Sequence, residues 1–218
     1  MNRRTTLIAL LVTICSTTIT QYAVGQERWI DKLFKKSSTE TTVEEHPELP
    51  ELTVDENLLI PELTDKQATQ ARKLQKKEAD RLQDNKLNVE LIRDNEVIKV
   101  TIPASQLFAP NTTKLLDSSD KVLRALLPCL RTPDYYHILL VMHSDNTGNE
   151  EYNYALTTER VFAIYDWFEG NGGCVEYVVP YAAGSFEPTK PNNTVTGRNA
   201  NRRLEVYIIP AEAMFAKK

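Results

Sequence analysis

The sequence of 218 residues has few glycines, few histidines and few cysteines. It contains seven glycines and no glycine-rich phosphate-binding motif, so we do not expect an anion site built from successive backbone N–H groups. The three histidines are far apart, and the GxSxG and HExxH motifs of hydrolases are absent. A metal site at His143, Asp145 and Glu150 would lack a second histidine or cysteine nearby. The sequence therefore indicates a protein that is not an enzyme and has no metal or cofactor.

A basic excess is also missing, because the formal net charge is -4 and the isoelectric point is about 5.5. Proteins that bind nucleic acids usually carry a broad positive surface, so we do not expect a nucleic-acid partner. Arginines nevertheless concentrate near the end of the chain, in the stretch TGRNANRRLEVYIIP at residues 196–210. Such a local cluster can serve one small anionic ligand.

The longest apolar run is too short to span a membrane. Two arginines precede an apolar stretch at residues 7–14, which then gives way to serine and threonine, whereas a span needs about 20 apolar residues. Small residues lie just before Gln26, as a signal peptidase requires. Residues 1–25 are therefore predicted to be a cleaved signal peptide. A retained N-terminal anchor and a lipid on Cys15 remain alternatives.

Export would leave two cysteines in the mature chain, Cys129 and Cys174. In an oxidising compartment two cysteines suggest a disulfide, and two buried free thiols are the alternative. Neither cysteine has a histidine nearby in the sequence that would suggest a catalytic thiol.

The first part of the mature chain has little hydrophobic periodicity. Residues 26–63 contain scattered acids and prolines, which favour an extended tether. Good helix formers follow, and Thr64 with Gln67 fits a capping box, so residues 64–86 are predicted to form a helix. Its apolar positions are sparse, which favours a solvated spacer helix over a partner-binding zipper. An outer-membrane or other envelope protein is a candidate partner for residues 26–86.

Residues 87–211 have the pattern of a globular domain, and residues 212–218 form a tail. Two short strands with a turn at Asp94 and Asn95 come first, and a helix follows. A near-continuous apolar run at residues 137–144 predicts a central strand, and a second helix, a strand and a last strand come after it. This order predicts an α/β fold, more narrowly an α+β sandwich, with two helices packed on one face of a small mixed β-sheet.

Charged and polar residues converge after the central strand. Asp145 lies at its carboxyl end, where open sheets place ligand groups. Asn153, Leu156 or Thr157, and Arg160 are spaced by three or four residues and therefore share a helix face. An acid and an arginine at one pocket suit a zwitterion, since the acid accepts an ammonium and the guanidinium binds a carboxylate. Alternatively, Asp145 only caps the turn, and Arg160 only pairs with it or with the surroundings of Glu159.

These residues recur in order over a long span. The chain has HSDNTGNEEYNYALTTER at residues 143–160 and GRNANRRLE at residues 197–205. From about Val89 to Ile209 it resembles the OmpA-like C-terminal domain, a peptidoglycan-binding module. The residues that match the family's pattern are Ser144-Asp145, Gly148, Tyr152-Asn153, Leu156-Thr157, Arg160, Pro188, Gly197-Arg198 and Asn201 to Glu205.

The resemblance implies that Asp145 and Arg160 grip the diaminopimelate of a peptidoglycan stem peptide. The other positions implied to shape, line or brace that pocket are Asn153, Leu156, Thr157, Arg202 and Arg203. The implied function is non-catalytic anchoring of the envelope to the cell wall, in the periplasm and at the outer membrane. The alternative is an OmpA-like assembly component of an envelope complex that does not itself bind peptidoglycan.

Overall fold

The computed structural model describes Val54, Leu58 and residues 63–215. The predicted signal peptide, most of the predicted tether and the last three residues lie outside the described residues. Within the described part of the chain, no helix is both long enough and apolar enough to cross a membrane.

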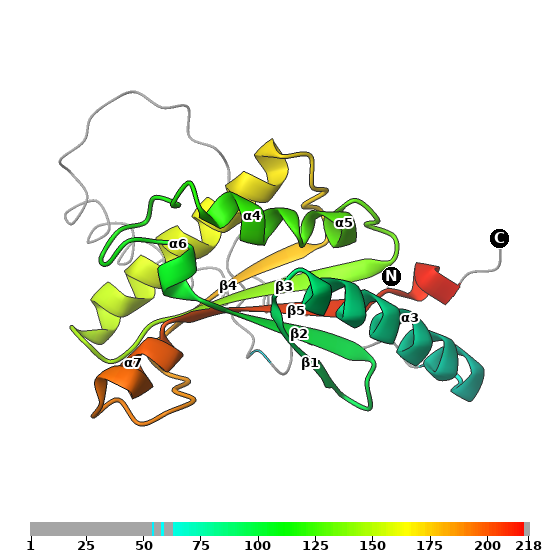
Figure 1. The fold of residues 1–218 in the computed structure, drawn as a ribbon, viewed down its shortest axis with the longest axis horizontal. Coiled ribbons are helices and arrows are strands. Elements are labelled where there is room, and N and C mark those ends of the chain that lie inside the picture. The colour runs from blue at the N-terminus through cyan, green and yellow to red at the C-terminus, as the bar shows by residue number, and fades with distance from the viewer. Residues whose placement is uncertain (1–53, 55–57, 59–62, 216–218) are drawn as a thin grey trace, which may run out of the picture. The chain divides into compact units, whose positions relative to one another are not determined.

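A five-stranded mixed sheet forms the centre of the domain, in the order β1-β2-β5-β3-β4. The strands are β1 (Asn88–Ile92), β2 (Val97–Pro103), β3 (Tyr136–His143), β4 (Val178–Gly184) and β5 (Arg203–Pro210). Strands β3 and β4 pair in parallel, whereas β1 with β2, β2 with β5, and β3 with β5 pair antiparallel. The mixed α/β architecture expected from the sequence is confirmed, and Figure 1 shows the helices beside the sheet.

The helices are α3 (Asp65–Asp84), α4 (Ser119–Arg124), α5 (Leu127–Leu130), α6 (Glu150–Gly170) and α7 (Val195–Asn201), with short 3-10 helices η1 (Ala104–Gln106) and η2 (Glu212–Phe215). Helices α3 to α6 contribute to one apolar cluster with alternate strand residues such as Val100, Leu140 and Val206. We call this side of the sheet the first face. The single helix predicted after β2 is two short ones, because Pro128, the second residue of α5, has no N–H to continue a helix from α4.

Helix α3 forms as predicted, with the capping box of Thr64, but the expectation of a solvated spacer is wrong. Ala79 and Leu82 are fully buried in the first-face cluster. The buried Gln75 side chain donates hydrogen bonds to the carbonyl oxygens of Glu96 at 2.9 Å and Ile208 at 3.1 Å. Small alanines allow close approach to the sheet but give a weak periodic signal, so the packed face was missed.

The opposite side of the sheet, the second face, has its own apolar cluster. Its strand residues are Val97, Leu139, Val141, Ala183, Tyr207 and Ile209. Val54 and Leu58 are buried in the same cluster, and the Leu58 N–H donates to the Val54 carbonyl, as in a helical turn. The prediction of an extended tether is therefore wrong at these two residues.

The two cysteines are free thiols in the structure. Cys129 is buried and its thiol donates to Glu78 Oε1 at 2.9 Å, and burial raises the pKa of that thiol. The Cys174 N–H donates to the carbonyl of Leu130, so the two segments are neighbours as expected. The suggested disulfide is nevertheless not formed, because the Cys129 thiol contacts α3 instead.

Candidate functional site

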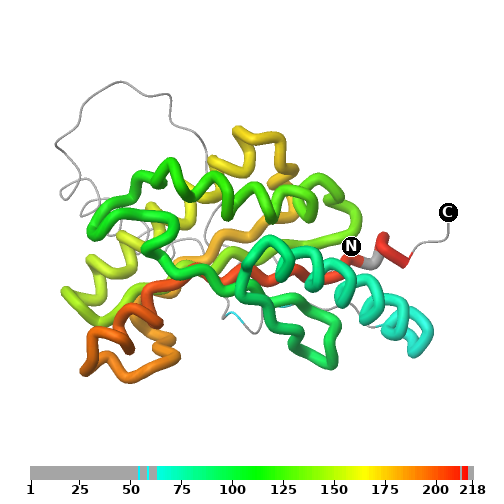
Figure 2. Tube along the Cα trace, in the orientation of Figure 1, coloured from blue at the N-terminus to red at the C-terminus, as the bar shows by residue number. Residues whose placement is uncertain are grey.

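A cavity of about 810 Å³ lies where three parts of the chain meet, and we call it the α6 cavity. These parts are the segment after β2, the loop and first turns of α6, and the end of α7 with Arg202. Figure 2 shows α7 and the beginning of α6 together at one end of the domain. The lining includes Phe108, Asp145, Asn153, Leu156, Arg160 and Arg202.

Asp145 follows β3 directly, and only 4% of its surface is exposed. Its Oδ1 accepts a hydrogen bond from the Thr147 N–H at 2.7 Å, and its Oδ2 pairs with Arg202 Nη1. Burial would raise the pKa of Asp145, but the hydrogen bonds from Thr147 and the charge of Arg202 outweigh burial and lower it. The carboxylate is therefore held ionised at the cavity wall.

Arg160 projects from α6 and is also 4% exposed. Its Nε donates to the Thr112 carbonyl at 2.8 Å, its Nη2 donates to the Ala109 carbonyl at 3.3 Å, and its guanidinium lies 4.9 Å from the centre of the Phe108 ring. Burial, with a smaller effect of the nearby Arg202, lowers the pKa of Arg160. A guanidinium has five N–H groups, so two backbone contacts fix its position and leave donors for a ligand.

Helix α6 presents its other predicted site residues in two directions. The Asn149 side chain caps the helix by accepting from the Tyr152 N–H, which fixes where the helix begins. Asn153 and Leu156 line the cavity. Thr157 does not, because its Oγ1 accepts from the Gly184 N–H at 3.1 Å and so joins α6 to β4.

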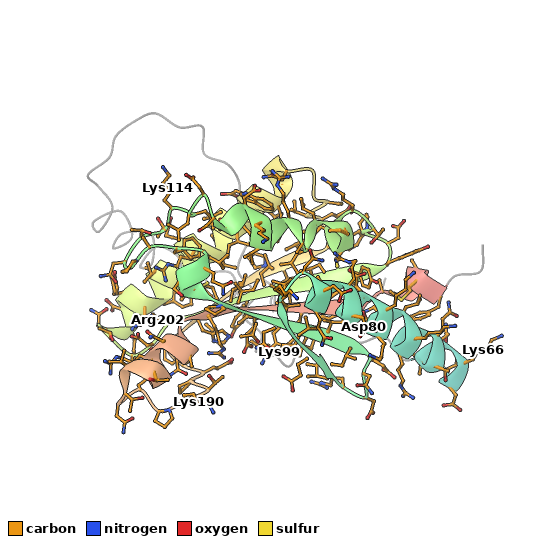
Figure 3. All side chains as sticks on the ribbon, in the orientation of Figure 1. Lys66, Asp80, Lys99, Lys114, Lys190 and Arg202 are labelled. Carbon is orange, nitrogen blue, oxygen red and sulfur yellow. The ribbon has the colours of Figure 1, made fainter. Side chains whose placement is uncertain are left out.

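Arg202 and Arg203 go to opposite faces of the sheet. Arg202 lines the α6 cavity, and Figure 3 labels it beside α7. Arg203 begins β5 with its Nε 2.8 Å from Glu205 Oε1, and it borders a different cavity of about 370 Å³, which we call the Glu205 cavity. Of the two arginines predicted to line or brace one pocket, Arg202 therefore lines the α6 cavity, whereas Arg203 ties the loop at Glu187 to the sheet through the Glu187 carbonyl. As the first residue of β5, Arg203 points away from the face that Leu204 shares with the helices.

Helix α7 sets the position of Arg202, and sequence reasoning missed this helix. The Thr194 side chain caps it by accepting from the Gly197 N–H. A methyl group at Gly197 would collide with the Pro191 carbonyl oxygen, so only glycine fits this approach. The buried Asn201 side chain accepts from the backbone N–H groups of Thr189 and Lys190, both at 2.9 Å. The loop and the helix therefore form one supported unit.

No family model matches the sequence. It is 31% identical over 106 residues to the outer-membrane lipoprotein YfiB of Pseudomonas aeruginosa, covering 49% of this chain and 62% of the relative. It is 25% identical over 101 residues to the peptidoglycan-binding protein ArfA of Mycobacterium tuberculosis, covering 46% of this chain and 31% of the relative. The chain thus spans less than two thirds of the length of these relatives.

Two solved structures share the fold. A MotB-like protein from Desulfovibrio vulgaris superposes with a TM-score of 0.59 at 20% identity, over 66% of this chain and 98% of that chain. The cell wall anchor of the type VI secretion system (T6SS) of Pseudomonas aeruginosa superposes with a TM-score of 0.51 at 26% identity, over 61% of this chain and 93% of that chain. The chain is therefore similar to proteins of the cell envelope over the region that contains the cavity.

The acid and the arginine at the α6 cavity do not satisfy each other. The alternative in which Asp145 caps its turn holds, because Oδ1 accepts from Thr147. The alternative in which Arg160 pairs with Asp145 does not hold, because the described partner of Asp145 is Arg202. Arg160 is bound instead by carbonyl oxygens, and no carboxylate of the described residues forms an ion pair with it.

Several residues that shape this site were not assigned to it from the sequence. Phe108, Ala109 and Thr112 contact Arg160 from a segment some 50 positions earlier, and nothing local in that segment signals the contact. Tyr152 also lines the cavity and is 37% exposed. Among the described residues, no group of three or more His, Cys, Asp or Glu side chains is arranged to hold a metal ion.

Proposed function

We propose that the α6 cavity binds the stem peptide of peptidoglycan, without catalysis, and so anchors the cell envelope to the wall. The observation that carries this proposal is that one cavity is lined by a buried carboxylate, Asp145, and a buried guanidinium, Arg160, that are not paired with each other. Two similar proteins, ArfA and the T6SS anchor, support it because their names state peptidoglycan binding and cell wall anchoring.

The ligand chemistry follows from these two groups. Diaminopimelate ends in an ammonium and a carboxylate on one carbon, so Asp145 can accept the ammonium and Arg160 can donate to the carboxylate. Each charge-assisted hydrogen bond contributes about 1.5–3 kcal/mol, which with packing gives a dissociation constant on the order of micromolar. The wall repeats its stem peptides, so sites of this affinity hold firmly when several engage. Asn153 and Leu156 shape the cavity beside the ligand.

This function places the protein in the periplasm, in contact with the wall and the outer membrane. The similarity to an outer-membrane lipoprotein of Pseudomonas aeruginosa supports this location. The predicted signal peptide at residues 1–25 provides a route of export, and an envelope protein is the proposed partner of residues 26–86. Mass spectrometry of the mature N-terminus distinguishes cleavage at Gln26 from a lipid on Cys15.

One observation favours a second candidate, an assembly component that does not bind the wall. Arg202 already pairs with Asp145, so a ligand ammonium must share this carboxylate with the arginine. The Arg202 side chain is 40% exposed, so it can shift to make room for the ammonium at little cost, which favours the binding function.

Co-sedimentation with purified peptidoglycan tests the proposal. Wild type should pellet with the wall, and Asp145→Ala and Arg160→Ala should remain in the supernatant while circular dichroism shows a retained fold. Asp120 and Arg124 on α4 form an exposed acid–arginine pair, so Asp120→Ala and Arg124→Ala are matched controls that should still pellet. Unchanged pelleting of both cavity variants would favour the assembly role.

A further inference from the structure

The second face of the sheet is apolar and lies away from helices α3 to α6. Alternate residues of β2, β3, β4 and β5 form it, and each is at most 6% exposed: Val97, Leu139, Val141, Ala183, Tyr207 and Ile209. Helices α3 to α6 pack on the first face and cannot account for this burial. Another part of the chain therefore shields the second face from water.

Val54 and Leu58 lie in that apolar cluster, with 8% and 6% of their surface exposed. Residues four positions apart share one face of a helical turn, and the hydrogen bond of 3.1 Å from the Leu58 N–H to the Val54 carbonyl closes such a turn. Val54 also borders the Glu205 cavity together with Lys99 and Tyr207.

One side chain of the cavity suits the charge of this segment. The stretch ELTVDENLLIPE at residues 51–62 contains acidic residues and no lysine or arginine. The Glu205 cavity, which Val54 borders, is lined by two cations, Lys99 and Arg203, and by two carboxylates, Glu187 and Glu205. Lys99 is 22% exposed at its side chain, and Figure 3 labels it on the sheet away from α4 and α5. Because Arg203 is buried, Lys99 is the cation of this cavity that an acidic segment can approach.

We propose that the second face is a docking site for this chain's own segment carrying Val54 and Leu58. The end of the tether is then fixed to the sheet before α3 begins, and the domain is attached to the tether through both of its faces. Docking removes residues 54–63 from the free tether, which shortens its maximum reach by about 35 Å. The consequence for the reach of the tether rests on the proposed wall-binding function. The docking itself does not depend on that function.

Methyl NMR of residues 26–218 tests the docking with internal controls. In the double variant Val54→Asp, Leu58→Asp the second-face methyl signals should shift, because their apolar cover is lost. First-face methyl signals from the same strands should stay in place. The second-face probes are Val97, Leu139, Val141 and Ile209, and the first-face probes are Val100, Ile102, Leu140 and Val206. Val195→Asp, at a valine that is 64% exposed on α7, is a matched control expected to move neither set.

A peptide of residues 50–62 added to the double variant should restore the second-face signals, and the same peptide with both aspartates should not. Unmoved second-face signals in the double variant, or no restoration by the peptide, would overturn the proposal. If both sets of methyls move because the fold is lost, Leu58→Ala is the milder test and should shift only the second-face set.

Measurements at several protein concentrations distinguish a segment docked within its own chain from a segment supplied by a second copy. Shifts and sedimentation coefficients that do not depend on concentration are expected for docking within one chain. Concentration-dependent shifts with a dimer in sedimentation would instead assign the segment to a second copy and overturn the proposal. The double variant should still pellet with peptidoglycan, so a failure of docking is distinguished from a failure of the wall-binding function.

Discussion

Arg202 and Arg203 are adjacent in the sequence, but the two faces of the sheet use them differently. The Arg202 side chain is 40% exposed at the α6 cavity, whereas the Arg203 side chain is 5% exposed beside Glu205. On the first face, Asp145 and Arg160 border an open cavity and are bound to different partners. On the second face, charges converge on one carboxylate.

That carboxylate is Glu205, which accepts from Arg203 Nε at 2.8 Å, Lys99 Nζ at 2.8 Å and the Tyr207 hydroxyl at 2.6 Å. Burial would raise the pKa of Glu205, but the nearby His143 and the hydrogen bonds from Lys99, Tyr207 and Arg203 lower it far below the ordinary range. The comparison separates two uses of buried charge. Charges satisfied within the protein stabilise the fold, and charges left facing a cavity are available to a ligand.

The largest expected effect is from Arg203→Ala. Removing one member of a buried ion pair leaves the other inadequately compensated, so the free energy of unfolding should fall by about 3 kcal/mol. Urea denaturation measures this loss, and the folded fraction should still pellet with peptidoglycan. If Arg203→Ala has normal stability but no longer binds the wall, Arg203 serves binding rather than stability, which would contradict this assignment.

Gly197→Ala should have an intermediate effect. The added methyl group collides with the Pro191 carbonyl, so α7 must move and the free energy of unfolding should fall by about 1–3 kcal/mol. Wall binding should weaken as well, because α7 leads into Arg202. Gly170→Ala is the matched control, since no atom lies within 4 Å of the added group and its stability should change by less than about 1 kcal/mol.

Arg202→Ala should change stability least among these variants. Its partner Asp145 keeps the Thr147 hydrogen bond, and an exposed arginine contributes about 1 kcal/mol or less to stability. Affinity for the wall should fall about tenfold, a loss of about 1.4 kcal/mol, because the carboxylate loses its orienting partner. Urea denaturation and co-sedimentation curves measured in parallel for Arg202→Ala and Arg203→Ala test this difference between the two arginines. Equal losses of stability and of wall binding in the two variants would contradict it.

The smallest effect is expected from pH. The pKa of Asp145 is lowered on folding, so its contribution to stability is present above the unfolded value of about 3.9 and is lost as pH falls through the lower folded value. Asp145 therefore stays ionised, and co-sedimentation should be unchanged between pH 8 and pH 5. A loss of binding centred between these values would contradict this expectation.

The sequence predicts much of the fold because alternating and continuous apolar runs report buried strands directly. The same alternation contains a signal that was not used for Arg203: Leu204, Val206 and Ile208 face the helices, so the arginine before them must face away. Helix α7 was missed because its seven residues include glycine and asparagines of weak helix propensity.

The rest of the site depends on contacts between distant segments. Asp145 and Arg160 follow from their motifs and their places at a strand end and a helix face. The partners of these two residues could not be predicted from the sequence, because Arg202 and the carbonyls of Ala109 and Thr112 reach them only in the folded chain. Likewise, the packing of α3 depends on alanines whose burial is decided by the sheet opposite them.

The most direct test of the central claim is titration calorimetry with two stem peptides, one with diaminopimelate and one with lysine, which lacks the terminal carboxylate. Wild type should bind the diaminopimelate peptide at about micromolar affinity and the lysine peptide at least tenfold more weakly, because Arg160 has no carboxylate to bind. Arg160→Ala should bind both peptides equally weakly, and Asp145→Ala should lose both. Equal affinity of the wild type for the two peptides, or an unchanged preference in Arg160→Ala, would contradict the account.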